Sequence, residues 1–308
     1  MKGSFEFKGV IPALVTPYTK SDEVDVGAIK WLVRNAIDNE VNGLMVVGSL
    51  GEFPSLTQAE RALVIAAAAE EANGKVPIIA GIGSASTKMA IAFAKDAAEN
   101  GADFLLALPP YYYNISDQAI YAHYESIASA VELPIILYNF PGTTKINLTP
   151  AMIAKLAQID NIVGLKNSVD SLIHLRQVLS LMRDSKKPFS VLAGMEDYML
   201  VGLLLGAKGT VSGLGNFIPG TLVRIYNDFM RGKVLEASEL FNRVVVPLKS
   251  LAPPPEPIGA LKMGASLMGP VNTAVRAPLT AATEETRNAM KAFLEKEGLL
   301  TRPTLHSA

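Results

Sequence analysis

Four polar residues end or follow short apolar runs, where a buried strand would carry them to the edge of a sheet. They are Ser49, Tyr113, Tyr138 and Lys166. Lys166 directly follows the apolar run that begins at Ile162. Burial lowers the pKa of a lysine, and a neutral amine attacks a carbonyl carbon to form a Schiff base. We therefore expect Lys166 to be a nucleophile; the alternative is a lysine whose stem lines a cavity and whose ammonium reaches solvent or a carboxylate.

Tyr138 ends another apolar run and is followed by a turn-rich Asn-Phe-Pro-Gly segment. Chemistry at a Schiff base needs a proton carrier, and a phenol held in a relay can serve. A buried tyrosine with a satisfied hydroxyl is the structural alternative. Tyr113, the last of three consecutive tyrosines, is a weaker candidate because aromatic clusters mostly pack.

Two glycine-rich turns could bind anions through backbone N–H groups. The first, residues 48–52, reads Gly-Ser-Leu-Gly-Glu, and its amides beside Ser49 could hold a small carboxylate. The second, residues 213–215, follows the eighth apolar run, where many barrels bind phosphate. Because of this second turn, a phosphorylated substrate stays an open alternative. Both turns could also serve only to reverse the direction of the chain.

The elements that must position these residues alternate along the chain. Helical segments with sensible starts, such as the N-cap Asp25 and the capping box of Thr57 and Glu60, separate short apolar runs. The runs lack the alternation of half-exposed strands, which is typical of a covered parallel sheet. Eight such units predict an α/β fold, a (β/α)8 TIM barrel, with its active site at the carboxyl ends of the strands. The predicted strands are residues 10–15, 44–47, 78–80, 104–107, 135–138, 162–166, 189–193 and 210–212.

The strand pattern stops near residue 231. We expect residues 1–231 to form the barrel and residues 232–308 to form a C-terminal helical extension. Its predicted helices are residues 233–251, 258–268 and 284–297, with the proline-rich run 253–257 between the first two because proline cannot continue a helix.

The composition of the chain argues against several classes of function. Lysine and arginine total 28 against 29 aspartates and glutamates, and no basic run is present, so we expect no nucleic-acid partner. No apolar stretch reaches about 18 residues without a charge or turn signal, so we expect no membrane span and a cytoplasmic location. The chain has no cysteine, and its three histidines are far apart, so we expect no metal site.

Three motifs in order give the chain a resemblance to a known family. They are the 48–52 turn, the Tyr-Asn-Phe-Pro segment from Tyr138, and Gly-Leu-Lys ending at Lys166. The sequence resembles the family of dihydrodipicolinate synthase and N-acetylneuraminate lyase, which are pyruvate-dependent Schiff-base aldolases. The resemblance implies that Lys166 forms a Schiff base with pyruvate, without cofactor or metal, and that Tyr138 carries protons.

The same resemblance implies further roles. Ser49 and the N–H groups of Ser49 and Leu50 would hold the pyruvate carboxylate, and Val211 would lie beside the nucleophile. Tyr113 would join the proton relay across a subunit contact. The family implies a homotetramer built as a dimer of dimers.

Two departures from the family pattern bear on the substrate. The synthases carry an arginine where this chain has Thr143, and a second hydroxyl where it has Leu50. A neutral threonine cannot replace a guanidinium that binds a carboxylate in bidentate fashion. Hydroxyl-bearing residues such as Thr143 and Ser168, with Thr144 and the carboxylates Glu196 or Asp197, fit a neutral polyol better.

We therefore expect a 2-keto-3-deoxygluconate aldolase type of enzyme, which reversibly cleaves a 2-keto-3-deoxy sugar acid to pyruvate and an aldehyde. The Tyr-Asn-Phe-Pro loop, the run 169–171 and the run 215–217 resemble that branch. The alternatives are a dihydrodipicolinate synthase condensing pyruvate with aspartate semialdehyde, a barrel enzyme acting on a phosphorylated sugar, and a non-catalytic barrel that binds pyruvate.

Overall fold

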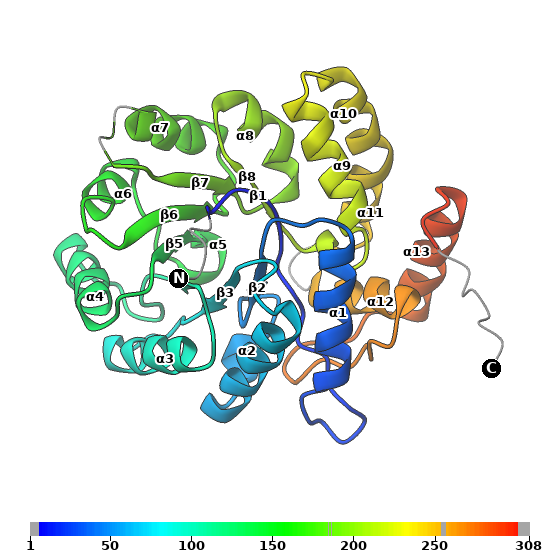
Figure 1. The fold of residues 1–308 in the computed structure, drawn as a ribbon, viewed down its shortest axis with the longest axis horizontal. Helices are drawn as coiled ribbons and strands as arrows, with labels where there is room; N and C mark the ends of the chain where they lie inside the picture. The colour runs from blue at the N-terminus through cyan, green and yellow to red at the C-terminus, as the bar shows by residue number, and fades with distance from the viewer. Residues whose placement is uncertain (1–5, 184, 186, 254–256, 301–308) are drawn as a thin grey trace.

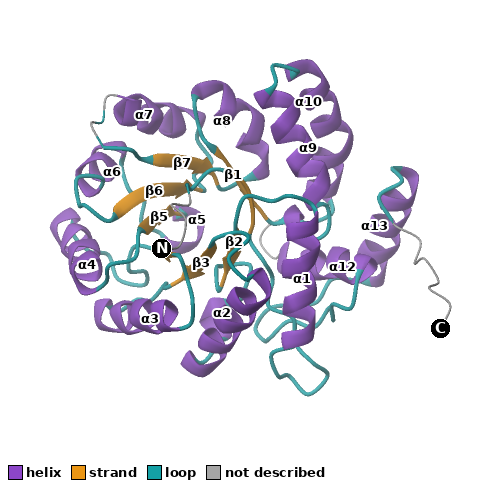
Figure 2. Cartoon of the chain, viewed as in Figure 1, coloured by secondary structure: helices purple, strands orange, loops and turns teal. Residues whose placement is uncertain are grey.

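Eight parallel strands form the centre of the molecule. The computed structural model describes residues 6–183, 185, 187–253 and 257–300. The strand order in the sheet is β1-β8-β7-β6-β5-β4-β3-β2, and a parallel bridge between Ala13 and Met45 joins the β1 side to β2. The sheet is therefore a nearly closed barrel with helices around it (Figures 1 and 2). The strands are β1 (Gly9–Pro12), β2 (Leu44–Val46), β3 (Ile78–Gly81), β4 (Phe104–Ala107), β5 (Ile135–Asn139), β6 (Ile162–Asn167), β7 (Ser190–Ala193) and β8 (Gly209–Ser212).

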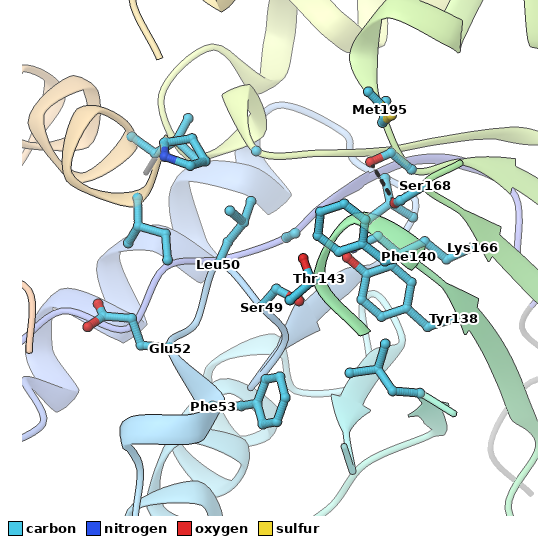
Figure 3. Close-up of a pocket in the computed structure, with 18 of the residues that line it drawn as sticks. Ser49, Leu50, Glu52, Phe53, Tyr138, Phe140, Thr143, Lys166, Ser168 and Met195 are labelled. Atoms are coloured by element: carbon cyan, nitrogen blue, oxygen red, sulfur yellow. Dashed lines mark hydrogen bonds between the residues drawn. The ribbon is translucent and has the colours of Figure 1, made fainter. Parts of the chain in front are cut away.

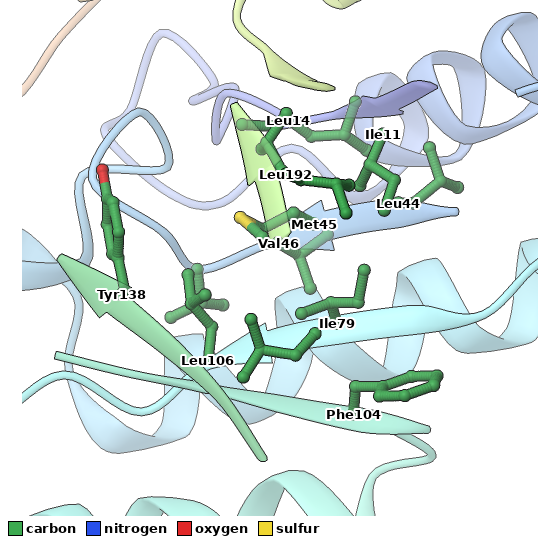
Figure 4. Close-up of a cluster of buried hydrophobic side chains, with 14 of the residues drawn as sticks. Ile11, Leu14, Leu44, Met45, Val46, Ile79, Phe104, Leu106, Tyr138 and Leu192 are labelled. Atoms are coloured by element: carbon green, nitrogen blue, oxygen red, sulfur yellow. The ribbon is translucent and has the colours of Figure 1, made fainter. Parts of the chain in front are cut away.

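Each predicted apolar run contains or overlaps one of these strands, so the predicted (β/α)8 barrel is confirmed. Figure 4 shows why the runs are apolar throughout: side chains such as Ile11, Met45 and Leu192 fill the interior of the barrel. The helices cover the other face, so neither face of a strand meets water. The Tyr138 ring lies at the edge of this cluster with its hydroxyl directed away from it (Figure 4).

The helices begin where capping residues predict. Asp25 accepts a hydrogen bond from the N–H of Ala28, and Thr57 and Glu60 form the predicted capping box. The helices of the barrel are α1 (Val26–Asp38), α2 (Gln58–Ala72), α3 (Thr87–Glu99), α4 (Asp117–Ala130), α5 (Pro141–Thr144), α6 (Pro150–Leu156), α7 (Leu172–Arg183), α8 (Met199–Leu205) and α9 (Pro219–Met230). Short 3-10 turns, η1 (Phe53–Ser55), η2 (Glu196–Tyr198) and η3 (Leu214–Asn216), follow β2, β7 and β8.

The C-terminal part of the described chain is helical, with α10 (Val234–Leu240), α11 (Val246–Ser250), α12 (Pro257–Met268) and α13 (Glu284–Lys296). The predicted helical stretch over 233–251 is helical in the structure, but it is not a regular α-helix throughout, because a π-helical turn, η4 (Phe241–Val245), lies between α10 and α11. Pro247 in the first turn of α11 explains the interruption, since proline has no N–H to donate and its ring crowds the preceding turn. The division of the chain at residue 231 stays a prediction, and residues 254–256 of the proline-rich run lie outside the described residues.

Helix α12 packs closely against the barrel. A Cβ added at Gly264 would lie 2.7 Å from the ring of Phe217, so only glycine permits this approach. Figure 1 shows α12 beside α1. Among the residues that the structure describes, no helix has the length and apolar character to cross a membrane.

Candidate active site

A cavity of about 530 Å³ lies at the carboxyl ends of the strands. Residues at the ends of β5, β6 and β8 line it, including Tyr138, Lys166 and Val211. The C-terminal helices supply another part of the wall through Lys249 and Leu261. This volume suits a small organic ligand, and the position is where TIM barrels carry their active sites.

Lys166 stands on β6 directly beside Tyr138 on β5. The two residues are partners in the parallel register. The Nζ atom of Lys166 lies 4.1 Å from the centroid of the Tyr138 ring and donates a hydrogen bond to the sulfur of Met45 at 3.7 Å. The side chain is almost fully buried, with 4% of its surface exposed. The structure therefore brings the predicted nucleophile and the predicted proton carrier together in the cavity, as Figure 3 shows.

Phe140 holds the Tyr138 ring from one side. The two rings are nearly parallel, at 19°, with centroids 5.9 Å apart. Phe140 precedes α5, whose first residue is Pro141, so the turn that ends β5 fixes its position. The Tyr138 ring therefore packs against Phe140 on one side and has the amine of Lys166 near its face.

The 48–52 turn forms the opposite wall of the cavity, where Ser49 and Leu50 both line the space (Figure 3). Within the described residues, no backbone carbonyl accepts a hydrogen bond from the N–H of Ser49 or Leu50. These two amides can therefore donate to a carboxylate. Glu52, at the end of the turn, is fully buried and pairs with Lys262 of α12 at 2.5 Å.

Most of the other predicted site residues also line the cavity. Val211 is buried beside it, Thr143 is exposed at its mouth, and Ser168 is buried and donates a hydrogen bond to the carbonyl of Gly194 at 3.1 Å. Gly194 is required there, because a Cβ would lie 2.1 Å from Ser168 Oγ and 3.0 Å from Lys166 Cγ.

Tyr113 does not line this cavity. Its side chain is 69% exposed, and its ring packs edge-on against Tyr112 with centroids 5.0 Å apart. Tyr111 lines the cavity instead. The expected role of Tyr113 lies across a subunit contact, so it stays a prediction.

The second glycine-rich turn is already occupied by a carboxylate of the chain. Glu196 Oε1 accepts hydrogen bonds from the N–H groups of Gly213 at 2.7 Å and Leu214 at 3.2 Å, and from the hydroxyl of Ser212 at 2.9 Å. These two amides are therefore not available to a phosphate. This arrangement argues against the phosphorylated-sugar alternative.

Sequence reasoning missed several residues that shape the site. Met45 and Phe140 contact the predicted catalytic pair, and Lys249 of α11 lines the cavity beside Glu196. Phe140 could have been found from its place in the Tyr-Asn-Phe-Pro loop. Met45 stands in an apolar run with no distinguishing neighbour, and Lys249 lies more than 30 residues beyond the last strand.

Comparisons with known proteins agree with this geometry. Residues 6–297 match the Dihydrodipicolinate synthetase family. A 4-hydroxy-tetrahydrodipicolinate synthase of Syntrophus aciditrophicus is 36% identical over 96% of this chain and 99% of its own length. A probable 2-dehydro-3-deoxy-D-pentonate aldolase of Escherichia coli, YjhH, is 33% identical over 96% of this chain and 99% of its own length.

Solved structures give the same result. The structure of YagE, a prophage protein of the dihydrodipicolinic acid synthase family from E. coli K12 in complex with pyruvate, superposes with a TM-score of 0.90 at 31% identity, covering 95% of this chain and 99% of that one. A dihydrodipicolinate synthase from Thermotoga maritima gives 0.91 at 30% identity, covering 96% and 99%. The expected family is thereby confirmed: this chain belongs to the dihydrodipicolinate synthetase family.

Proposed function

We propose that this protein is a carbon–carbon lyase, a class I aldolase in which Lys166 forms a Schiff base with pyruvate. The observation that carries the proposal is the buried amine of Lys166 at the end of β6, 4.1 Å from the Tyr138 ring inside the cavity. A desolvated lysine beside a proton carrier is the arrangement that nucleophilic attack on a carbonyl requires. The pyruvate complex of the YagE structure supports this substrate.

The chemistry can be followed atom by atom. The unprotonated amine of Lys166 attacks C2 of pyruvate to form a carbinolamine, which takes up a proton on its hydroxyl and loses water to leave a protonated imine. The imine withdraws electrons, so a proton passes from the methyl group to the proton relay at Tyr138 and an enamine forms. The enamine carbon attacks the aldehyde carbon, and the alkoxide so formed takes a proton through Tyr138. Water then hydrolyses the imine and releases the product; cleavage follows the same steps in reverse.

The 48–52 turn would fix pyruvate for this attack. Ser49 and Leu50 line the cavity and their amides have no backbone partner among the described residues, so these amides and the hydroxyl of Ser49 are the groups that would hold the carboxylate. Leu50 cannot pass on a proton, so Tyr138 would depend on other groups for its relay. Tyr113 of a neighbouring subunit in a homotetramer is the group that we propose.

The acceptor that fits this cavity best is a neutral hydroxylated aldehyde such as glyceraldehyde. Thr143 and Ser168 present hydroxyls, and no arginine lines the described part of the cavity. Lys249 lines it too, but Glu196 Oε2 lies 3.3 Å from its Nζ and Asp197 Oδ2 4.0 Å. A second carboxylate would thus meet no unpaired cation at this end. The reaction would be reversible cleavage of a 2-keto-3-deoxy sugar acid.

A second candidate is the synthase reaction with aspartate semialdehyde. The names of the relatives favour it, because synthases of two organisms match at 36% and 34% identity, against 33% for the pentonate aldolase. Identities this close do not separate the two reactions. By contrast, Thr143 stands where the synthases carry an arginine, and this difference removes a positive charge from the end of the site that would bind the acceptor aldehyde.

Borohydride reduction in the presence of pyruvate, followed by peptide mass mapping, tests the shared chemistry. We expect a stable adduct on Lys166 in the wild-type protein and none in Lys166→Met. Absence of the adduct at neutral pH would exclude a Schiff-base aldolase. An adduct without turnover of any aldehyde would identify a non-catalytic pyruvate-binding barrel.

A panel of aldehydes then separates the two acceptors. We expect glyceraldehyde to react with pyruvate faster than aspartate semialdehyde does. If the semialdehyde reacts much faster, the synthase is the correct assignment and the argument from Thr143 is wrong.

A further inference from the structure

A compact charge cluster forms the wall of the cavity at the ends of β7 and β8. It consists of Glu196 and Asp197, in the turn after β7, and Lys249 on α11. Glu196 and Lys249 both line the cavity. The Schiff-base mechanism makes no use of either residue, so their place beside the substrate needs another explanation.

Glu196 has little capacity left for a ligand. One oxygen already accepts three hydrogen bonds, from the hydroxyl of Ser212 at the end of β8 and from two amides of the turn that follows, and the other lies 3.3 Å from the Nζ of Lys249. Burial works to raise the pKa of this carboxyl, but Lys249 and these hydrogen bonds outweigh it and keep the pKa below its usual value. Glu196 is therefore a fixed negative charge that holds the ammonium of Lys249 at the wall.

Lys249 retains donors for a ligand. An ammonium has three N–H groups. One faces Glu196, while Asp197 at 4.0 Å lies beyond hydrogen-bond distance. The side chain is 28% exposed, so a molecule in the cavity can reach it.

The charge balance of the cluster selects the ligand. Two carboxylates surround one ammonium, so the net charge near Lys249 is negative and a further anion is disfavoured. A hydroxyl oxygen can still accept a hydrogen bond from the ammonium without adding charge. The site therefore suits a neutral hydroxylated chain.

We propose that Lys249 is a specificity-determining residue that donates a hydrogen bond to a hydroxyl of the acceptor aldehyde, and that Glu196 is the positioning residue that holds it there. This inference rests on the proposed aldolase function and names the group that recognises the hydroxylated end of its substrate.

The test compares two acceptors that differ only in their hydroxyl groups, glyceraldehyde and propanal, in condensation with pyruvate. The readout is the ratio of their kcat/KM values in the wild-type protein and in Lys249→Met. Removing a charged donor should lower this ratio by about tenfold or more, because the hydroxyl then loses its partner. Lys249→Arg keeps a charged donor and should retain most of the ratio.

A ratio in Lys249→Met equal to that of the wild type would overturn the inference, even if both rates fell, because a purely structural role affects both aldehydes alike. Glu196→Gln should lower the ratio as well; a wild-type ratio there would overturn its positioning role. If the wild-type protein forms the pyruvate adduct but does not prefer glyceraldehyde over propanal, the proposed acceptor and this inference both fail. If that preference is present and Lys249→Met keeps it, only the inference fails.

Discussion

Replacing Lys262 by methionine should destabilise the protein by several kcal/mol, because it would leave the carboxylate of Glu52 buried without its counter-charge. Both side chains have no exposed surface, and Nζ lies 2.5 Å from Glu52 Oε1. The ammonium also donates to the carbonyl of Ala274 at 2.6 Å and stands 4.1 Å from the centroid of the Tyr18 ring. Methionine keeps the volume of the stem and removes only the charge and the donors.

Breaking a fully buried pair by removing one partner costs about 3–5 kcal/mol. The carboxylate of Glu52 would keep one donor, the N–H of Arg276 at 2.9 Å, which argues for the lower half of that range. At about 2 °C per kcal/mol for a chain of this size, the thermal midpoint should fall by roughly 6–8 °C. Differential scanning calorimetry at neutral pH measures this shift.

Two further variants isolate the cause. Lys262→Met combined with Glu52→Gln removes both charges, and it should recover much of the loss because a neutral pair is tolerated in an apolar interior. Lys30→Met removes a comparable ion pair at 2.8 Å whose partner Glu70 is 72% exposed, so its midpoint should change by about 1 °C or less. If Lys262→Met shifts the midpoint no more than Lys30→Met does, the buried ion pair between Lys262 and Glu52 is not what stabilises the contact between the 48–52 turn and α12.

Three other perturbations test the site and the fold. Tyr138→Phe should lower kcat for the aldol reaction by about 10² or more while borohydride still traps pyruvate, since a proton carrier is lost and the amine is not; equal turnover would remove Tyr138 from its role. Thr143→Arg should raise kcat/KM for aspartate semialdehyde by about tenfold relative to glyceraldehyde, because a guanidinium supplies the missing cation; an unchanged ratio would contradict our account of the acceptor end. Burial lowers the pKa of His123 to about 4. The unfolded chain therefore binds a proton below about pH 6.5 that the folded protein does not, and stability should fall by about 2 kcal/mol between pH 7 and pH 5. His123→Gln should flatten this part of the stability curve, and an unchanged slope would show that other groups cause it.

The barrel and the adjacency of Tyr138 and Lys166 could be predicted because both depend on short-range patterns. An apolar run marks each strand, and consecutive β-α units place consecutive strands side by side. Tyr138 and Lys166 each end such a run, so their adjacency in the β5–β6 register follows from the chain order. Their roles stay proposals, but their meeting in one cavity needed only the strand assignments.

The contacts of Glu196 could not be predicted in the same way. The sequence places a carboxylate after β7 and a glycine-rich turn after β8, and both patterns pointed to ligand binding. Only the three-dimensional arrangement shows that the carboxylate occupies the amides of Gly213 and Leu214. Two candidate ligand-binding groups can thus be hydrogen-bonded to each other in the folded protein, and local sequence patterns do not reveal such a contact.

Lys249 was missed for a geometric reason. Each residue advances an α-helix by about 100°, so the face that a residue occupies depends on an uninterrupted count. The π turn at Phe241–Val245 adds a residue to one turn and rotates everything after it relative to the continuous helix that the sequence predicts. The periodicity of α10 therefore cannot place Lys249 on the face of α11 that meets the cavity. The π-helical turn before Pro247 thus helps to set which side chain the C-terminal helices present to the cavity.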